Sequence, residues 1–92
     1  TELSVDSEYA QARQFYLHGL SPDERAHLHA NIAKAFRSVS RIEVKLRFLV
    51  ACYKTHPDYA RGILQLYDEI TFDQVEQCAK ALQDKHTVDR AN

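Results

Sequence analysis

The sequence predicts an all-α fold, a small bundle of about four to five short helices. Only two glycines and two prolines occur among the 92 residues, fewer turn-forming residues than strand-and-turn proteins use. Apolar residues recur at intervals of three and four along most of the chain, as on the buried face of a helix. Serine or threonine followed three residues later by glutamate or glutamine precedes several of these stretches, a pattern typical of helix starts.

The composition is that of one globular domain covering residues 1–92. Hydrophobic residues make up 45% and charged residues 27%, and the formal net charge of −1 gives no reason to expect a nucleic-acid partner. The longest apolar run, Phe48 to Cys52, is far shorter than the roughly 20 residues of a membrane span, so no membrane partner is expected. Cys52 and Cys78 lie among apolar neighbours, which predicts buried thiols in a reducing compartment. Because the sequence starts at Thr1 and contains no methionine, we expect a processed chain or part of a longer one.

The first helix is predicted over Ser7 to His18. Asp6 or Ser7 supplies a short side-chain oxygen for the free amides of the first turn. Gly19 follows the predicted end, a place where a positive φ is often required. Helical spacing is followed by Tyr9, Ala12, Tyr16 and Leu20, with Phe15 beside them.

The second helix is predicted to begin after Ser21, in the segment SPDE. The Ser21 side chain can accept from the Glu24 amide while the Glu24 side chain accepts from the Ser21 amide. Pro22 suits the first helical position because it has no amide to leave unpaired. The predicted buried face carries Leu28, Ile32, Phe36 and Val39.

The third helix is predicted to begin with the same capping device, here between Ser40 and Glu43. Val44 and Phe48 are expected to widen its apolar surface and make it the most buried helix. The residues assigned to its main apolar face are Ile42, Leu46, Leu49, Val50 and Tyr53.

Pro57 predicts a break after the third helix, because the residue before a proline avoids the α region. A helix resumes beyond it, and Gly62 within that helix is expected to allow a close approach by another element. A last helix, Thr71 to Leu82, is predicted to start at a cap formed by Thr71 and Gln74. The apolar residues assigned to the helix after Pro57 are Tyr59, Ile63, Leu66, Tyr67 and Ile70.

Three histidines flank the first turn and raise the question of a metal site. His27 and His29 are about 200° apart around a helix, whereas a helical histidine pair that binds a metal is spaced by four residues. We therefore predict no metal ligands and interpret these two and His18 as polar surface residues. His56, next to Pro57, is predicted to cap or hydrogen-bond at the break.

No catalytic residue is predicted, since the chain has no GxSxG, P-loop or GxGxxG motif and its serines lie at predicted helix ends. One candidate binding feature remains. Gln11, Phe15 and Gly19 recur at four-residue intervals, and this stripe of an amide, an aromatic ring and a bare backbone position suits a flat ligand. The alternative, which the residues alone favour, is that Phe15 packs in the core, Gln11 is solvated and Gly19 ends the helix.

Two segments resemble the C-terminal helical region of haem catalases. In QARQFYLHGLSPDERAHLHANIAKAF, the family's Q-x-R-x-F-Y helix, its leucine, its acidic capped turn and its NIA motif occur in order. THPDYARGILQLYD is similar to the family's histidine-proline-acid-tyrosine segment and the helix after it. The resemblance covers roughly Tyr9 to Asp68. The matching residues of the first segment are Gln11, Arg13, Phe15, Tyr16, Leu20, Glu24, Arg25, Asn31, Ile32 and Ala33.

The resemblance implies a non-catalytic C-terminal domain of a haem catalase that decomposes hydrogen peroxide to water and oxygen. Haem and the catalytic residues would lie elsewhere in the parent enzyme. The implied partners are the β-barrel core and wrapping segment of that enzyme, within a homo-oligomer such as a homotetramer. In NADPH-binding members a glutamine and a phenylalanine of the first helix contact the cofactor, and these positions match Gln11 and Phe15. The next contact is typically valine, where this chain has Gly19.

Two other functions remain open: the domain of a catalase-like haem oxidoreductase in a biosynthetic pathway, and an independent helical protein-interaction module. The ending DRAN is similar to the Ala-Asn-Leu peroxisomal ending of some catalases but lacks its leucine. The expected location is peroxisomal or cytoplasmic.

Overall fold

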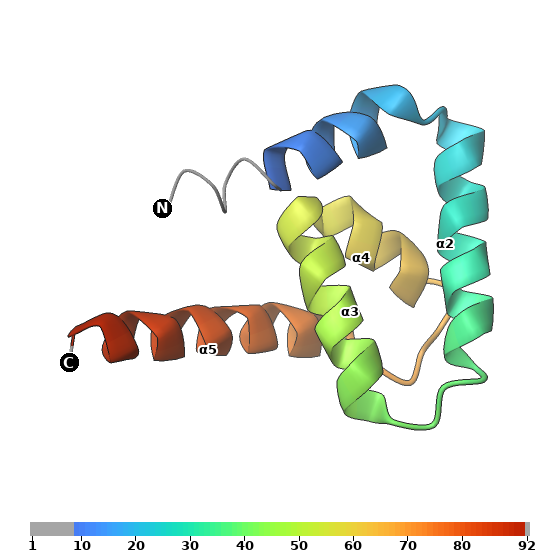
Figure 1. Ribbon diagram of the computed structural model, residues 1–92. Helices are drawn as coiled ribbons and strands as arrows, with labels where there is room; N and C mark the ends of the chain where they lie inside the picture. The colour runs from blue at the N-terminus through green and yellow to red at the C-terminus, as the bar shows by residue number, and fades with distance from the viewer. Residues whose placement is uncertain (1–8, 92) are drawn as a thin grey trace.

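The computed structural model describes residues 9–91, with side chains described for residues 9–81, and this part of the chain is helical without strands (Figure 1). This confirms the predicted all-α fold. Residues 9–14 are α-helical and continue directly into a π-helical turn, η1, over Phe15–Gly19. The other helices are α2 (Pro22–Phe36), α3 (Ile42–Thr55), α4 (Pro57–Leu64) and α5 (Phe72–Ala91).

The short helix α4 connects the bundle, because it packs against α2, α3 and α5. Helix α3 also packs against α5. Towards its C-terminal end, α5 projects away from the other helices (Figure 1). The buried core is built mainly from aliphatic and aromatic side chains of these helices: Ala33, Phe36, Leu49, Val50, Cys52, Ala60, Ile63, Ile70, Val75 and Ala79.

The two cysteines are free thiols. Cys52 is buried as predicted, and burial raises the pKa of its thiol to about 12. Cys78 is only partly buried and packs against the same core. The high pKa keeps Cys52 in its unreactive protonated form at neutral pH.

Of the three predicted caps that pair Ser or Thr with a Glu or Gln three residues later, two are present, whereas the predicted helix start at Ser7 and its cap at Asp6 or Ser7 lie outside the described residues. At the start of α2 the Glu24 amide donates to Ser21 Oγ (3.2 Å) and the Ser21 amide donates to Glu24 Oε1 (2.8 Å). At the start of α5 the Gln74 amide donates to Thr71 Oγ1 (3.1 Å) and the Thr71 amide donates to Gln74 Oε1 (2.8 Å). Both caps satisfy amides that have no partner within the helix.

The cap predicted between Ser40 and Glu43 was wrong. Helix α3 takes Arg41 as its N-cap residue and has no side-chain cap. Arg41 Nε instead donates to Glu43 Oε1 at 2.6 Å, so the carboxylate is used by a guanidinium. The helix also begins one residue later than a Ser40 cap requires, so Glu43 is no longer at the third helical position.

Helix α3 buries Leu49 and Val50 but leaves other apolar side chains in solvent. Val44 is 49% exposed and Phe48 is 45% exposed, so these two side chains widen the apolar surface of α3 as predicted but do not add to its buried face. The reason lies in how the helices pack. Helices α4 and α5 cover the face of α3 that carries Leu49, whereas no described element covers the face that carries Val44. Ile42, at the first turn, is also 45% exposed.

The predicted break before α4 is present, but α4 starts at Pro57 itself rather than beyond it and ends at Leu64, earlier than the apolar pattern indicated. Leu66 therefore falls outside the helix and is exposed, while Ile70 fills the core from the connection between α4 and α5. Helix α5 extends to Ala91, beyond the predicted end at Leu82, and no glycine or proline interrupts it.

The connection before α5 is held by Lys45, whose side chain is buried. Its ammonium donates to the Tyr67 hydroxyl (2.5 Å) and to Glu69 Oε1 (2.7 Å). These contacts with Glu69 and Tyr67 raise the pKa of Lys45, so the amine stays charged and paired.

Candidate functional site

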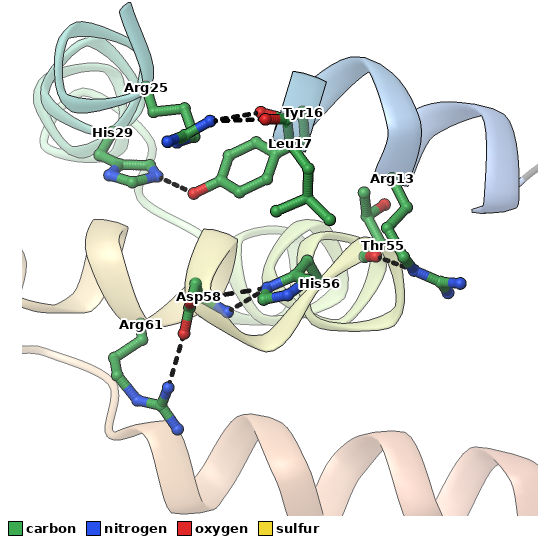
Figure 2. Close-up of polar contacts among 9 residues, drawn as sticks. All are labelled: Arg13, Tyr16, Leu17, Arg25, His29, Thr55, His56, Asp58 and Arg61. Atoms are coloured by element: carbon green, nitrogen blue, oxygen red, sulfur yellow. Dashed lines mark hydrogen bonds and ion pairs between the residues drawn. The ribbon is translucent and has the colours of Figure 1, made fainter. Parts of the chain in front are cut away.

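The first helix is fixed to the end of α3 by an arginine. Arg13 Nε donates to the Thr55 carbonyl oxygen at 2.7 Å (Figure 2), and its Nη2 donates to the Lys54 carbonyl oxygen at 3.2 Å. The last carbonyls of a helix have no partner within it, and a cation is favoured there by the helix dipole. One side chain thus caps α3 and positions the first helix.

A second arginine fixes the other end of the first helix. Arg25 Nη1, from α2, lies within hydrogen-bond distance of the carbonyl oxygens of Tyr16 (3.1 Å), Leu17 (3.1 Å) and Leu20 (2.9 Å). In the π turn itself, the Leu20 amide donates to the Phe15 carbonyl oxygen at 3.1 Å. Arg25 therefore satisfies the carbonyls that the end of this helix leaves free.

Tyr16 is the buried residue of the first helix, only 3% exposed. Its ring stacks on that of Tyr59, with centroids 4.6 Å apart and planes 8° apart. Its hydroxyl is hydrogen-bonded to His29 Nε2 at 2.6 Å (Figure 2). Burial raises the pKa of Tyr16, and burial together with the neighbouring Arg25 charge lowers the pKa of His29. Both groups are therefore held neutral, which suits a structural hydrogen bond.

His29 is packed directly against the backbone of α4. A Cβ atom at Gly62 would lie 2.2 Å from His29 Nδ1 and 2.3 Å from its Cε1, so no larger residue fits beside this imidazole. This confirms the predicted close approach at Gly62. It also corrects the interpretation of His29 as a surface residue, which the sequence did not reveal because its partners lie in other helices.

His18, His27 and His56 agree with their predicted roles. His56 Nδ1 accepts from the Asp58 amide at 3.1 Å and so caps α4 at the break before Pro57. His18 and His27 are exposed. Among the residues whose side chains are described, no group of three metal-ligating side chains is placed to hold a metal ion.

The predicted stripe of Gln11, Phe15 and Gly19 lies on the exposed face of the first helix, away from the side anchored by Arg13 and Tyr16. Phe15 is 63% exposed, so the alternative that it packs in the core was wrong. Its ring lies on Gly19, where a Cβ atom would be 2.7 Å from Phe15 Cδ1.

Gly19 also differs from its expected conformation. It does not have a positive φ, and it is the last residue of η1 rather than a cap beyond the helix. The reason is that the wider π turn extends the helix by one residue and ends at Leu20, whose backbone is extended.

An open pocket with a volume of about 300 Å³ lies between α2 and α4. Tyr16 and His29 line it but are hydrogen-bonded to each other, and Arg61 Nη1, also in the lining, donates to Asp58 Oδ1 at 2.8 Å. The phenol and the imidazole are therefore already engaged in a hydrogen bond that holds the helices together. The other lining residues are Pro22, Arg25, Ala26, Gly62 and Gln65.

A family model described as catalase-related immune-responsive matches residues 3–67. The chain belongs to this catalase-related family. Comparisons with curated proteins and with solved structures gave no match. The matched region contains the stripe, both arginine anchors and the Tyr16–His29 pair, and it ends before α5.

In this catalase-related chain, several of the residues that carry the family resemblance hold the fold together. Arg13 and Arg25 fix the two ends of the first helix, Tyr16 is its buried contact, and Glu24 completes the cap of α2. The stripe differs from these residues, because Gln11, Phe15 and Gly19 are exposed. In the described part of the chain, no helix is both long and apolar enough to cross a membrane.

Proposed function

We propose that this catalase-related chain is the non-catalytic C-terminal helical domain of a haem catalase that decomposes hydrogen peroxide to water and oxygen. Membership of the family supports this role. The hydrogen bonds of Tyr16, His29 and Arg25 support it as well, since these polar groups serve the packing of helices. Haem and the peroxide chemistry would then belong to a β-barrel core in the parent enzyme.

We further propose that the outward stripe contributes part of an NADPH site in the parent enzyme. The observation that carries this is the division of the first helix into an anchored face and a free face. Gln11 offers an exposed amide for a polar edge, and Phe15 offers an exposed aromatic ring for a flat group. NADPH, when bound to such enzymes, supplies hydride for reduction, and the role of these two residues is binding and orientation.

The proposed partner of the domain is the β-barrel core of the same parent chain. The half-exposed Val44 and Phe48 of α3 provide apolar surface for such a contact. A catalase-like oxidoreductase of a biosynthetic pathway would use the same domain, and the two parents differ in whether hydrogen peroxide is converted to oxygen.

The test is to isolate the native protein with an antibody against this chain and to measure its mass, absorption spectrum and oxygen release from hydrogen peroxide. The proposal predicts a species much larger than 10.6 kDa with a Soret band and catalase activity. A native 10.6 kDa species without haem would instead show an independent module. As a control, the isolated chain mixed with haem is expected to give no Soret shift.

A further inference from the structure

The ring of Phe15 occupies the space that a side chain at position 19 would take. A Cβ atom at Gly19 would lie 2.7 Å from Phe15 Cδ1, 3.1 Å from its Cε1 and 3.3 Å from its Cγ. One side of the ring therefore rests on the helix backbone. The ring is nevertheless 63% exposed, so its other side faces solvent.

The obstacle to a larger residue at position 19 is this ring. Gly19 does not have a positive φ, so its backbone conformation suits any residue. The conflicting atoms belong to an exposed side chain, which can turn to another rotamer. A methyl group at position 19 would thus move the Phe15 ring without disrupting the core.

We propose that Gly19 is a positioning residue, whose missing side chain lets the Phe15 ring lie along the first helix and present its open side to a flat heteroaromatic ring of a dinucleotide. This inference rests on the proposed NADPH site. It assigns Gly19 a role through Phe15 rather than a contact of its own with the ligand. A side chain at position 19 would require a different orientation of the Phe15 ring.

The first test uses the chain alone and needs no ligand. In the NMR spectrum, the α-protons of Gly19 should show a ring-current shift that disappears in Phe15→Leu. Unchanged Gly19 α-proton shifts in Phe15→Leu would overturn the proposed seating of the ring, even if the parent enzyme binds NADPH.

The second test measures NADPH affinity in the parent enzyme. Gly19→Ala should weaken binding about two- to twelvefold, the range expected for one aromatic contact. His18→Ala, an exposed change on the same helix, is the matched control and should leave the affinity unchanged. Thermal unfolding of Gly19→Ala should remain close to wild type, which separates positioning from a loss of folding.

A double-mutant comparison decides whether Gly19 acts through Phe15. In the Phe15→Leu background, Gly19→Ala should cause no further loss of affinity, because the ring that it positions is already absent. An equal loss in both backgrounds would contradict the positioning role and show a direct contact. Failure of the wild-type parent to bind NADPH would refute the cofactor part of the proposed function as well as this inference, whereas the NMR result tests the ring seating by itself.

Discussion

The Tyr16 hydroxyl and His29 Nε2 lie 2.6 Å apart and join the first helix to α2 across 13 residues of sequence. Tyr16 also stacks on Tyr59, while His29 rests on Gly62, so the pair links the first helix, α2 and α4. The position of the outward stripe relative to the bundle therefore depends on this contact.

Acidification should weaken the fold through His29. Its pKa is lowered by burial and by the nearby Arg25 charge, against an opposing effect of Asp58. An unfolded histidine, with a pKa near 6.5, binds a proton more readily, so its contribution to stability is complete above about pH 6.5 and is lost as the pH falls towards the folded pKa. Urea denaturation between pH 8 and pH 5 should show this loss, and His29→Gln should reduce it. If the free energy of unfolding depends on pH equally in wild type and His29→Gln, then His29 is not the source of the pH dependence.

Tyr16→Phe should destabilise the protein by about 1 kcal/mol, because the ring stacking is kept and one hydrogen bond to a partly buried imidazole is lost. Tyr53→Phe is a matched control, since its hydroxyl donates to Glu76 at 3.1 Å. The control variant should lose less stability, because Glu76 on α5 can hydrogen-bond to water instead. Equal changes in the denaturation midpoints of the two variants would mean that the Tyr16–His29 hydrogen bond contributes no more to stability than the Tyr53–Glu76 hydrogen bond.

Ser21→Ala should cost about 1 kcal/mol, because it removes one half of the cap at the start of α2. Ser40→Ala provides the comparison, as α3 has no side-chain cap and the change is expected to stay within about 0.5 kcal/mol. Chemical denaturation of both variants measures the difference. Similar costs for the two serines would contradict the assigned helix starts.

These two serines show how far local sequence predicts this fold. The caps at Ser21 and Thr71 involve residues three apart, so a pattern is enough to find them. Ser40 fits the same pattern but fails, because the Arg41 guanidinium takes the Glu43 carboxylate and the helix begins later. A rule based on residue spacing does not take account of competition between neighbouring side chains.

The stripe was predicted only in part for a similar reason. Four-residue spacing places Phe15 and Gly19 on one face, and the structure confirms that they meet. Whether that face is buried depends on where Arg13 and Tyr16 fix the helix, and their partners Thr55 and His29 are distant in sequence. Periodicity alone therefore favoured a buried Phe15, and the tertiary contacts placed it in solvent.

The two glycines should respond differently to the same substitution. Gly62→Ala should destabilise the protein by about 1–3 kcal/mol, since the new methyl group would overlap the confined His29 ring. Gly19→Ala should be nearly neutral or slightly stabilising, since the exposed Phe15 ring can move and alanine favours helix. Thermal denaturation of both variants tests this contrast, and a neutral Gly62→Ala would disprove the tight contact between α2 and α4.

The most direct measurement of the central proposal, that the outward stripe is a cofactor face of a haem enzyme, is an NADPH titration of the full-length parent. Gln11→Ala should weaken binding by about 0.5–1.5 kcal/mol, or about two- to twelvefold, through loss of one hydrogen bond, while stability is unchanged. Gln14→Ala removes another exposed amide, which lies off the stripe, and this variant should bind NADPH like wild type. Equal affinities of wild type and Gln11→Ala, or no binding by wild type, would contradict the account.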